Sequence, residues 1–167
     1  TDNVAAYEAY LRGYALYDLS VGESTDLAAL RQFDAAISTD PEFADAHAMR
    51  SFTLAAIANS ASGVNETGQL YSQAITAAER AIAIEPKLAR GHLALGFALN
   101  NGKLQRAKAA EHYRAAEQLA PGDADVLRGV ATFYSYGKEQ ASAARMILRV
   151  LELDPLNARA LSAAGYI

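Results

Sequence analysis

The stretch Asp123–Pro155, DADVLRGVATFYSYGKEQASAARMILRVLELDP, decides the fold. Its apolar residues recur at helical spacing in two segments, which predicts helices over residues 123–136 and 139–152. It closes on a proline, and a proline directly past a helix end is a stop signal because it cannot continue the helical hydrogen bonding. The chain contains four prolines, and each ends a similar apolar segment: AAISTDP, AIAIEP, AEQLAP and VLELDP.

The spacing of these prolines indicates an internal repeat. They stand at Pro41, Pro86, Pro121 and Pro155, at intervals of 45, 35 and 34 residues. A period near 34 residues with two helices per unit is typical of the tetratricopeptide repeat (TPR), with its pattern W-x2-L-G-x2-Y, then A-x3-F, then P. The opening stretch fills these slots in order, without an insertion, with Leu127, Val130, Ala131, Tyr134, Ala143, Ile147 and Pro155.

The chain therefore resembles the TPR family over nearly its whole length. The resemblance implies an all-α fold, a right-handed TPR α-solenoid with four helix pairs plus a partial fifth repeat. Residues 1–167 form a single TPR domain in this interpretation, with repeats at about 3–41, 43–86, 88–121 and 123–155 and a partial repeat at 157–167. The expected helices span residues 3–19, 26–38, 43–60, 66–84, 88–101, 105–119, 123–136, 139–152 and 157–167.

Two features of the turns can be predicted as well. Thr25 or Asp26 is expected to cap the second helix, and Asn157 the last. The longer proline intervals reflect insertions at residues 18–26 and 59–69, each at the turn between the two helices of a repeat. Both insertions are expected to project from the same edge of the solenoid, either as functional loops or as loops that drifted in length.

Composition excludes several classes of function. The net charge is −4, with 15 basic and 19 acidic residues interspersed and no basic block, so nucleic acid is not an expected partner. The absence of cysteine excludes disulfides, thiolate zinc sites and cysteine nucleophiles. No apolar run approaches the roughly 20 residues that a membrane span needs.

The three histidines are the obvious candidates for chemistry. His47 and His92 occupy the same bulky slot in adjacent repeats, which indicates packing rather than metal binding, and His112 is expected at the surface. No serine-nucleophile elbow, phosphate-binding loop or H-E-x-x-H motif occurs. We therefore expect no catalytic, cofactor-binding or metal-binding residues, and no enzyme activity in this chain.

The first helix suggests a binding surface. In AYEAYLRGYALYDLS, residues 6–20, four tyrosines fall within roughly an 80° arc of one helix. In a TPR array the first helices of successive repeats line a concave groove, which the resemblance implies as the site for a peptide or protein. Packing is expected to dominate for Tyr10 and Tyr17, whereas packing and ligand contact both stay open for Tyr7 and Tyr14. With residues of the same phase in later repeats, the candidate groove contacts are Tyr7, Tyr10, Tyr14, Tyr17, Phe52, Arg90, Phe97, Asn100, Asn101, Arg128 and Tyr136.

A closer resemblance rests on the opening AY-x-x-YLRG, residues 6–13, and on FDAAI-x-x-DP, residues 33–41. These motifs are similar to the C-terminal TPR regions of bacterial signalling proteins. In those proteins the N-terminal module is a class III adenylate cyclase domain or a winged-helix DNA-binding domain, often followed by one membrane span. The resemblance implies a regulatory module of a larger protein, which lies in the cytoplasm or, if it follows a membrane span, in the periplasm. Because the first residue is Thr1, the chain looks like a piece of such a protein.

Other functions stay open. The last predicted helix contains the apolar segment ALSAAGYI and has no partner helix, so the chain is also a candidate self-association element that dimerises through its C-terminal end. A free-standing adaptor and a small-molecule sensor at the tyrosine end of the groove are further alternatives. The groove lacks the Lys, Asn and Arg set with which some TPR proteins grip a C-terminal carboxylate, so chaperone tails are not expected ligands.

Overall fold

The computed structural model describes residues 1–19, 21–157 and 160–161. Within these residues the chain forms helices and connecting turns, and no strand. The helices are α1 (Val4–Leu19), α2 (Glu23–Thr39), α3 (Ala44–Ser60), α4 (Val64–Ile84), α5 (Ala89–Gly102), α6 (Arg106–Leu119), α7 (Ala124–Tyr136) and α8 (Gln140–Leu153). None of the described helices has a stretch long and apolar enough to cross a membrane.

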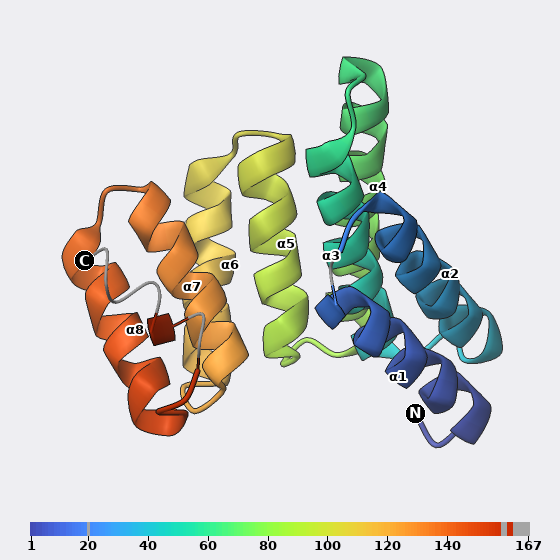
Figure 1. The fold of residues 1–167 in the computed structure, drawn as a ribbon, viewed down its shortest axis with the longest axis horizontal. Coiled ribbons are helices and arrows are strands. Elements are labelled where there is room, and N and C mark those ends of the chain that lie inside the picture. Colours follow the sequence, from blue (N-terminus) through green and yellow to red (C-terminus); the bar gives the residue numbers. More distant parts are fainter. Residues whose placement is uncertain (20, 158–159, 162–167) are drawn as a thin grey trace.

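The helices pair along the chain, and the pairs stack from one end of the molecule to the other (Figure 1). The closest packing joins α1 to α2, α3 to α4, α5 to α6 and α7 to α8, and each pair also packs against the next. This arrangement is the predicted α-solenoid of four helix pairs. The partial fifth repeat falls largely outside the described residues, but its expected cap is present: the Asn157 Oδ1 accepts a hydrogen bond from the Ala160 amide at 3.0 Å.

The slots of the repeat pattern form the core. In the fourth repeat Leu127, Val130 and Ala131 are almost fully buried. The small slot of the first repeat allows close approach, because a Cβ atom added at Gly13 would lie 2.8 Å from the Cε1 atom of Phe33 on the partner helix. Leu127 and Val130 also share one apolar cluster with Leu93 of the preceding repeat, so the repeats stabilise one another by stacking.

The turn between α1 and α2 differs from the prediction. Neither Thr25 nor Asp26 caps α2; the helix begins at Glu23, and its N-cap is Gly22, with φ 131° and no side-chain cap. The amides of Thr25 and Asp26 instead donate to the Gly22 carbonyl at 3.0 and 3.2 Å. The predicted cap was wrong because a glycine can adopt this positive φ and so start the helix one turn earlier.

The second insertion is helical over most of its length. Residues 59–60 belong to α3 and residues 64–69 to α4, so the connection is reduced to residues 61–63. The α3–α4 hairpin therefore extends beyond the neighbouring α5–α6 turn (Figure 1). Tyr71 fastens it by donating a hydrogen bond from its hydroxyl to Asn59. Residues 59–69 are an extension of two helices rather than a loop.

Candidate functional site

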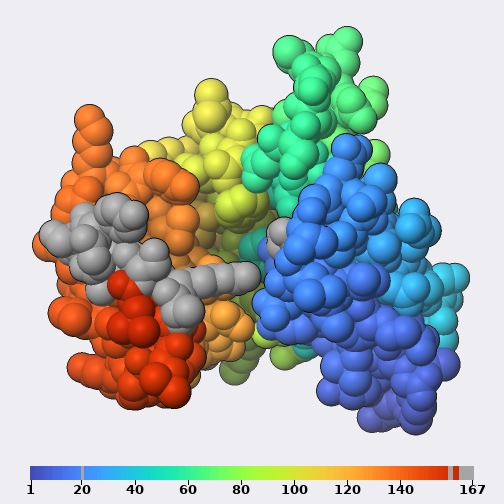
Figure 2. Space-filling view, viewed as in Figure 1, coloured from blue at the N-terminus to red at the C-terminus, as the bar shows by residue number. Residues whose placement is uncertain are grey.

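The inner helices α1, α3, α5 and α7 enclose a pocket on the concave side of the solenoid. In the space-filling view the surface is hollowed between the N-terminal helices and the C-terminal ones, with α5 at the floor of the hollow (Figure 2). The cavity has a volume of about 240 Å³. Side chains of all four inner helices line it, together with Tyr113 of α6. One pocket thus spans four repeats.

The floor of the pocket is apolar and aromatic. The rings of Phe52 on α3 and Phe97 on α5 lie 6.2 Å apart between centroids. Further along, Tyr113 and Phe133 stack with centroids 4.2 Å apart. Aromatic side chains bury a large apolar area on contact, so these rings offer a surface against which another apolar side chain can pack.

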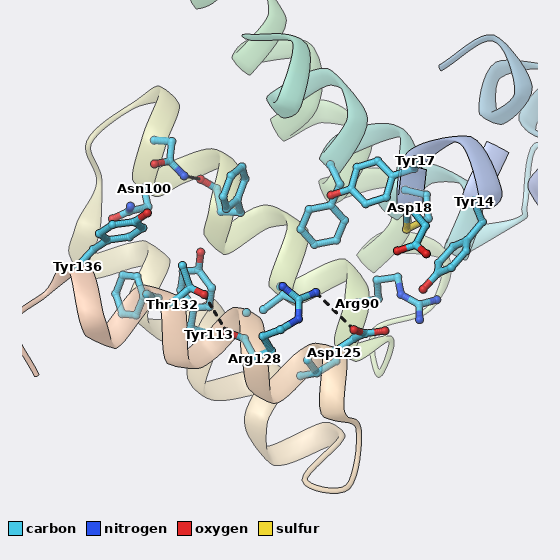
Figure 3. Close-up of a pocket in the computed structure, with 18 residues that line it drawn as sticks. Tyr14, Tyr17, Asp18, Arg90, Asn100, Tyr113, Asp125, Arg128, Thr132 and Tyr136 are labelled. Atoms are coloured by element: carbon cyan, nitrogen blue, oxygen red, sulfur yellow. Dashed lines mark hydrogen bonds and ion pairs between the residues drawn. The ribbon is translucent and has the colours of Figure 1, made fainter. Parts of the chain in front are cut away.

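The two ends of the pocket differ in chemistry. Tyr14, Tyr17 and Asp18 of α1 lie at one end, and Asn100 and Tyr136 lie at the opposite end (Figure 3). The first end also carries the charged groups of α5 and α7, Arg90, Asp125 and Arg128, whereas the lining at the second end is polar and uncharged. A bound ligand therefore meets a charged end, an aromatic floor and a neutral polar end in that order.

The guanidinium group of Arg90 is held by the protein itself. It donates to Asp45 Oδ1 at 2.8 Å and to the Tyr10 hydroxyl at 3.2 Å. The same group lies 6.0 Å from the centre of the Tyr14 ring, within cation–π range. Arg90 therefore joins α1, α3 and α5, and Asp45 neutralises its charge.

Arg128 is held less firmly. Its Nη2 atom lies 3.4 Å from Asp125 Oδ1, one helical turn away on α7. Both side chains line the pocket, and Asp125 is the more exposed of the two. Exposed ion pairs at this spacing are weak, and either group can exchange its partner for a ligand.

The pocket brings together most of the residues proposed from the sequence. Nine of the eleven candidate groove contacts line it: Tyr14, Tyr17, Phe52, Arg90, Phe97, Asn100, Asn101, Arg128 and Tyr136. Tyr7 and Tyr10 do not. Tyr10 is only 8% exposed and packs 5.0 Å from the ring of Phe43 between centroids, and burial raises its pKa to about 12. Tyr7 lies on the outside of the pocket and is 49% exposed.

The structure adds lining residues that the candidate set did not contain. Asp18, Leu93, Asp125, Gly129 and Thr132 lie on the same faces as named candidates, and their helical phase was a usable signal. The remaining additions are residues whose burial in packing positions hides them from a search for surface groups: Met49, Tyr113, Val126 and Phe133.

The histidines occupy structural positions. His47 Nε2 lies 3.0 Å from the Pro41 carbonyl oxygen, and His92 Nε2 lies 3.1 Å from that of Pro86, so the equivalent slots make equivalent contacts. The expectation that His112 stands at the surface was wrong. It is partly buried, and its Nδ1 lies 3.1 Å from His92 Nδ1 because α5 and α6 pack side by side. Among the described residues, no three histidine or acidic side chains converge as a metal site would require.

Comparisons with solved structures identify the fold. A thermophilic TPR protein from Thermus thermophilus matches with a TM-score of 0.69 and 17% identity, over 97% of this chain and 98% of that chain. A crystal structure of MamA matches with a TM-score of 0.55 and 18% identity, over 95% of this chain and 83% of that chain. The chain therefore has the TPR fold. No protein-family model matches the sequence, and the search of curated proteins finds no significant match.

Proposed function

We propose that this chain is a protein-interaction module that binds a peptide segment of a partner protein in its concave pocket. The observation that carries the proposal is the pocket itself, which four inner helices line with an aromatic floor and polar ends. Exposed and partly exposed aromatic side chains on a rigid scaffold provide contact area at low entropic cost. The TPR fold of the similar structures supports an interaction module in general.

Two tyrosines provide a matched test. Tyr136 lines the pocket and is 79% exposed, whereas Tyr7 is 49% exposed and lies outside it. Because Tyr136 is largely exposed and Tyr7 is about half exposed, truncation to alanine should leave the fold intact in each case. The probe is a displayed library of random twelve-residue peptides, selected on the wild-type chain and then measured singly by isothermal titration calorimetry.

The expected result is that Tyr136→Ala weakens the selected peptides, while Tyr7→Ala binds them as the wild type does. Loss of a contact at the edge of a pocket costs about 1 kcal/mol, or about fivefold in affinity. Circular dichroism of both variants checks that the helices persist. If no peptide is selected, or if both variants bind equally well, the pocket is not the peptide site.

We propose further that the module belongs to a larger bacterial signalling protein of the adenylate cyclase-like or winged-helix kind. The similarity of residues 6–13 and 33–41 to the C-terminal TPR regions of those proteins supports this. The groove would then receive a signal and regulate an attached output domain. The test is the reading frame upstream of Thr1 in the source DNA. A cyclase domain, or a winged helix with a membrane span, supports the proposal, and a start codon or a signal peptide alone refutes it.

Self-association is a second candidate, favoured by exposed leucines near the C-terminal end. Leu148 is 60% exposed, Leu156 86% and Leu161 50%. A dimer through this end would bury these leucine side chains. Light scattering should report a dimer that Leu148→Glu dissociates; a monomer at high protein concentration contradicts this function.

A further inference from the structure

A row of aromatic side chains on the inner helices stops short of the fourth repeat. The position five residues after the bulky first slot of the repeat pattern holds Tyr14 in the first repeat, Phe52 in the second and Phe97 in the third. In the fourth repeat the same position, five residues after Leu127, holds Thr132. All four side chains at this position line the pocket. The fourth repeat therefore lacks the ring that the other three place there.

The rings of the second and third repeats form the exposed part of the apolar floor. Phe52 and Phe97 are only partly buried, and their centroids lie 6.2 Å apart with the ring planes tilted by 52°. This separation is within the range in which tilted aromatic pairs attract one another. The remaining Met, Leu, Val and Phe side chains of the lining are buried: Met49, Leu93, Val126 and Phe133.

The packing of α5 against α7 brings the threonine level with the last ring of the row. Leu93 of α5 meets α7 at Gly129, where an added Cβ atom would lie 2.9 Å from Leu93 Cδ1. Because α6 returns the chain between them, α5 and α7 run in the same direction (Figure 1). One turn further along each helix are Phe97 and Thr132, so these two side chains border the same part of the pocket.

Thr132 leaves this position open without an unpaired polar group. It is exposed, and its Oγ1 donates a hydrogen bond to the Arg128 carbonyl, one turn earlier on α7, at 2.9 Å. Its hydroxyl is therefore satisfied by its own helix and requires no partner from a ligand. An apolar group can pack against this position without leaving that hydroxyl unsatisfied.

We infer that the bound peptide carries one aromatic side chain, which packs beside Phe97 over Thr132 and completes the row in the fourth repeat. The inference rests on the proposed function, because it names the anchor of a peptide in the same pocket. The cavity of about 240 Å³ is smaller than the roughly 300–1,000 Å³ of a typical small-molecule pocket, which suits a single anchoring side chain. Charge gives no comparable preference, since the lining carries equal numbers of carboxylates and guanidinium groups: Asp18, Asp125, Arg90 and Arg128.

The test uses three labelled decapeptide libraries that differ at one central position. That position is Phe in the first library, Leu in the second and Ala in the third, and the other positions are randomised among Gly, Ser, Thr, Asn and Gln. Fluorescence anisotropy with the wild-type chain should rank the affinities Phe above Leu above Ala. The step from Leu to Phe should be about two- to tenfold, as expected for an aromatic pair beyond the area that it buries.

A substitution that fills the position from within locates the anchor. Thr132→Phe places a ring of the protein itself in the row, so it should weaken binding of the Phe library to the level of the Ala library. Thr76→Phe is the matched control, because Thr76 is exposed on α4 outside the pocket and its Oγ1 donates to the Ser72 carbonyl at 3.1 Å. The control should bind all three libraries as the wild type does. Thr132→Leu replaces Thr132→Phe if the latter alters the helical circular dichroism.

Two results would overturn the inference. A Leu or Ala library that binds as tightly as the Phe library would show that the pocket selects no ring, while peptide binding as such would stand. Undiminished binding of the Phe library to both Thr132→Phe and Thr132→Leu would place the anchor elsewhere. Failure of all three libraries to bind, together with an empty selection from the random library, would instead refute the peptide-binding function itself.

Discussion

The small slot of the first repeat allows a sharp test of how this solenoid is packed. Gly13 lies on α1 and faces Phe33, whose side chain is fully buried on α2. A Cβ atom at Gly13 would lie 2.8 Å from Phe33 Cε1 and 3.0 Å from Cδ1 and Cζ. The Gly13→Ala variant therefore has to move a fully buried ring or separate the two helices.

The magnitude follows from two opposing effects. Replacing a helical glycine by alanine stabilises a helix by up to about 1 kcal/mol. Overpacking a tight core costs about 1–3 kcal/mol. The expected net change for Gly13→Ala is a loss of about 0–2 kcal/mol in the free energy of unfolding. Gly68, also helical, has no neighbouring atom within 4 Å of its added Cβ, so Gly68→Ala shows the helical gain alone.

The measurement is thermal and urea unfolding of both variants, followed by circular dichroism at the helical band. The two variants should differ by about 1–3 kcal/mol, which corresponds to roughly 2–12 °C in melting temperature for a chain of this size. If Gly13→Ala is stabilised as much as Gly68→Ala, the Phe33 ring moves aside with no loss in the free energy of unfolding. Close approach at the small slot would then not be what holds the first helix pair together.

Three further predictions concern single side chains. Tyr14→Ala should keep the helical circular dichroism and weaken any ligand of the pocket; unfolding of this variant would assign Tyr14 to packing instead. His112 has a pKa lowered by burial and by the charge of His92, so its contribution to stability is complete above the unfolded-state pKa near 6.5 and is lost as the pH falls below it. The melting temperature should therefore drop from roughly pH 7 to pH 5.5, and it should drop less in His112→Ala; an equal drop in that variant contradicts the assignment. Asp26 is 5% exposed, and its Oδ1 has no hydrogen-bond partner. Its pKa is raised, first by burial and then by the charge of Glu23. The ionised carboxylate therefore destabilises the fold, and this cost is absent in acid and appears as the pH rises through that pKa. Asp26→Asn should raise the free energy of unfolding by about 1 kcal/mol at pH 7 and by less near pH 3, as measured by urea titration. An equal gain at both pH values would show that the charge of Asp26 is not the source of the gain.

Much of the architecture could be predicted because local patterns carry it. The recurrence of Pro41, Pro86, Pro121 and Pro155 located the helix ends, and the helical period located the buried slots between them. The same period placed the faces of the inner helices, which is why nine proposed residues meet around one pocket. Their role in binding stays a prediction until a ligand is tested.

The failures share a physical cause. The start of α2 at Glu23 depends on Gly22 adopting a positive φ, and no periodic signal reports that choice. The contact between His92 and His112 depends on the register of α5 against α6, which side-chain packing sets. Patterns within one helix do not determine how far a neighbouring helix is shifted along it.

The sequence by itself determined that this chain is a stack of helix pairs and which face of each helix is buried, since both follow from spacing along the chain. The tertiary structure alone decided the electrostatics of the pocket. Asp45 neutralises Arg90 from the preceding repeat, and Tyr10 reaches it from 80 positions earlier in the chain. Such contacts depend on the angle at which successive repeats stack, and that angle is the sum of many small packing choices between neighbouring helices.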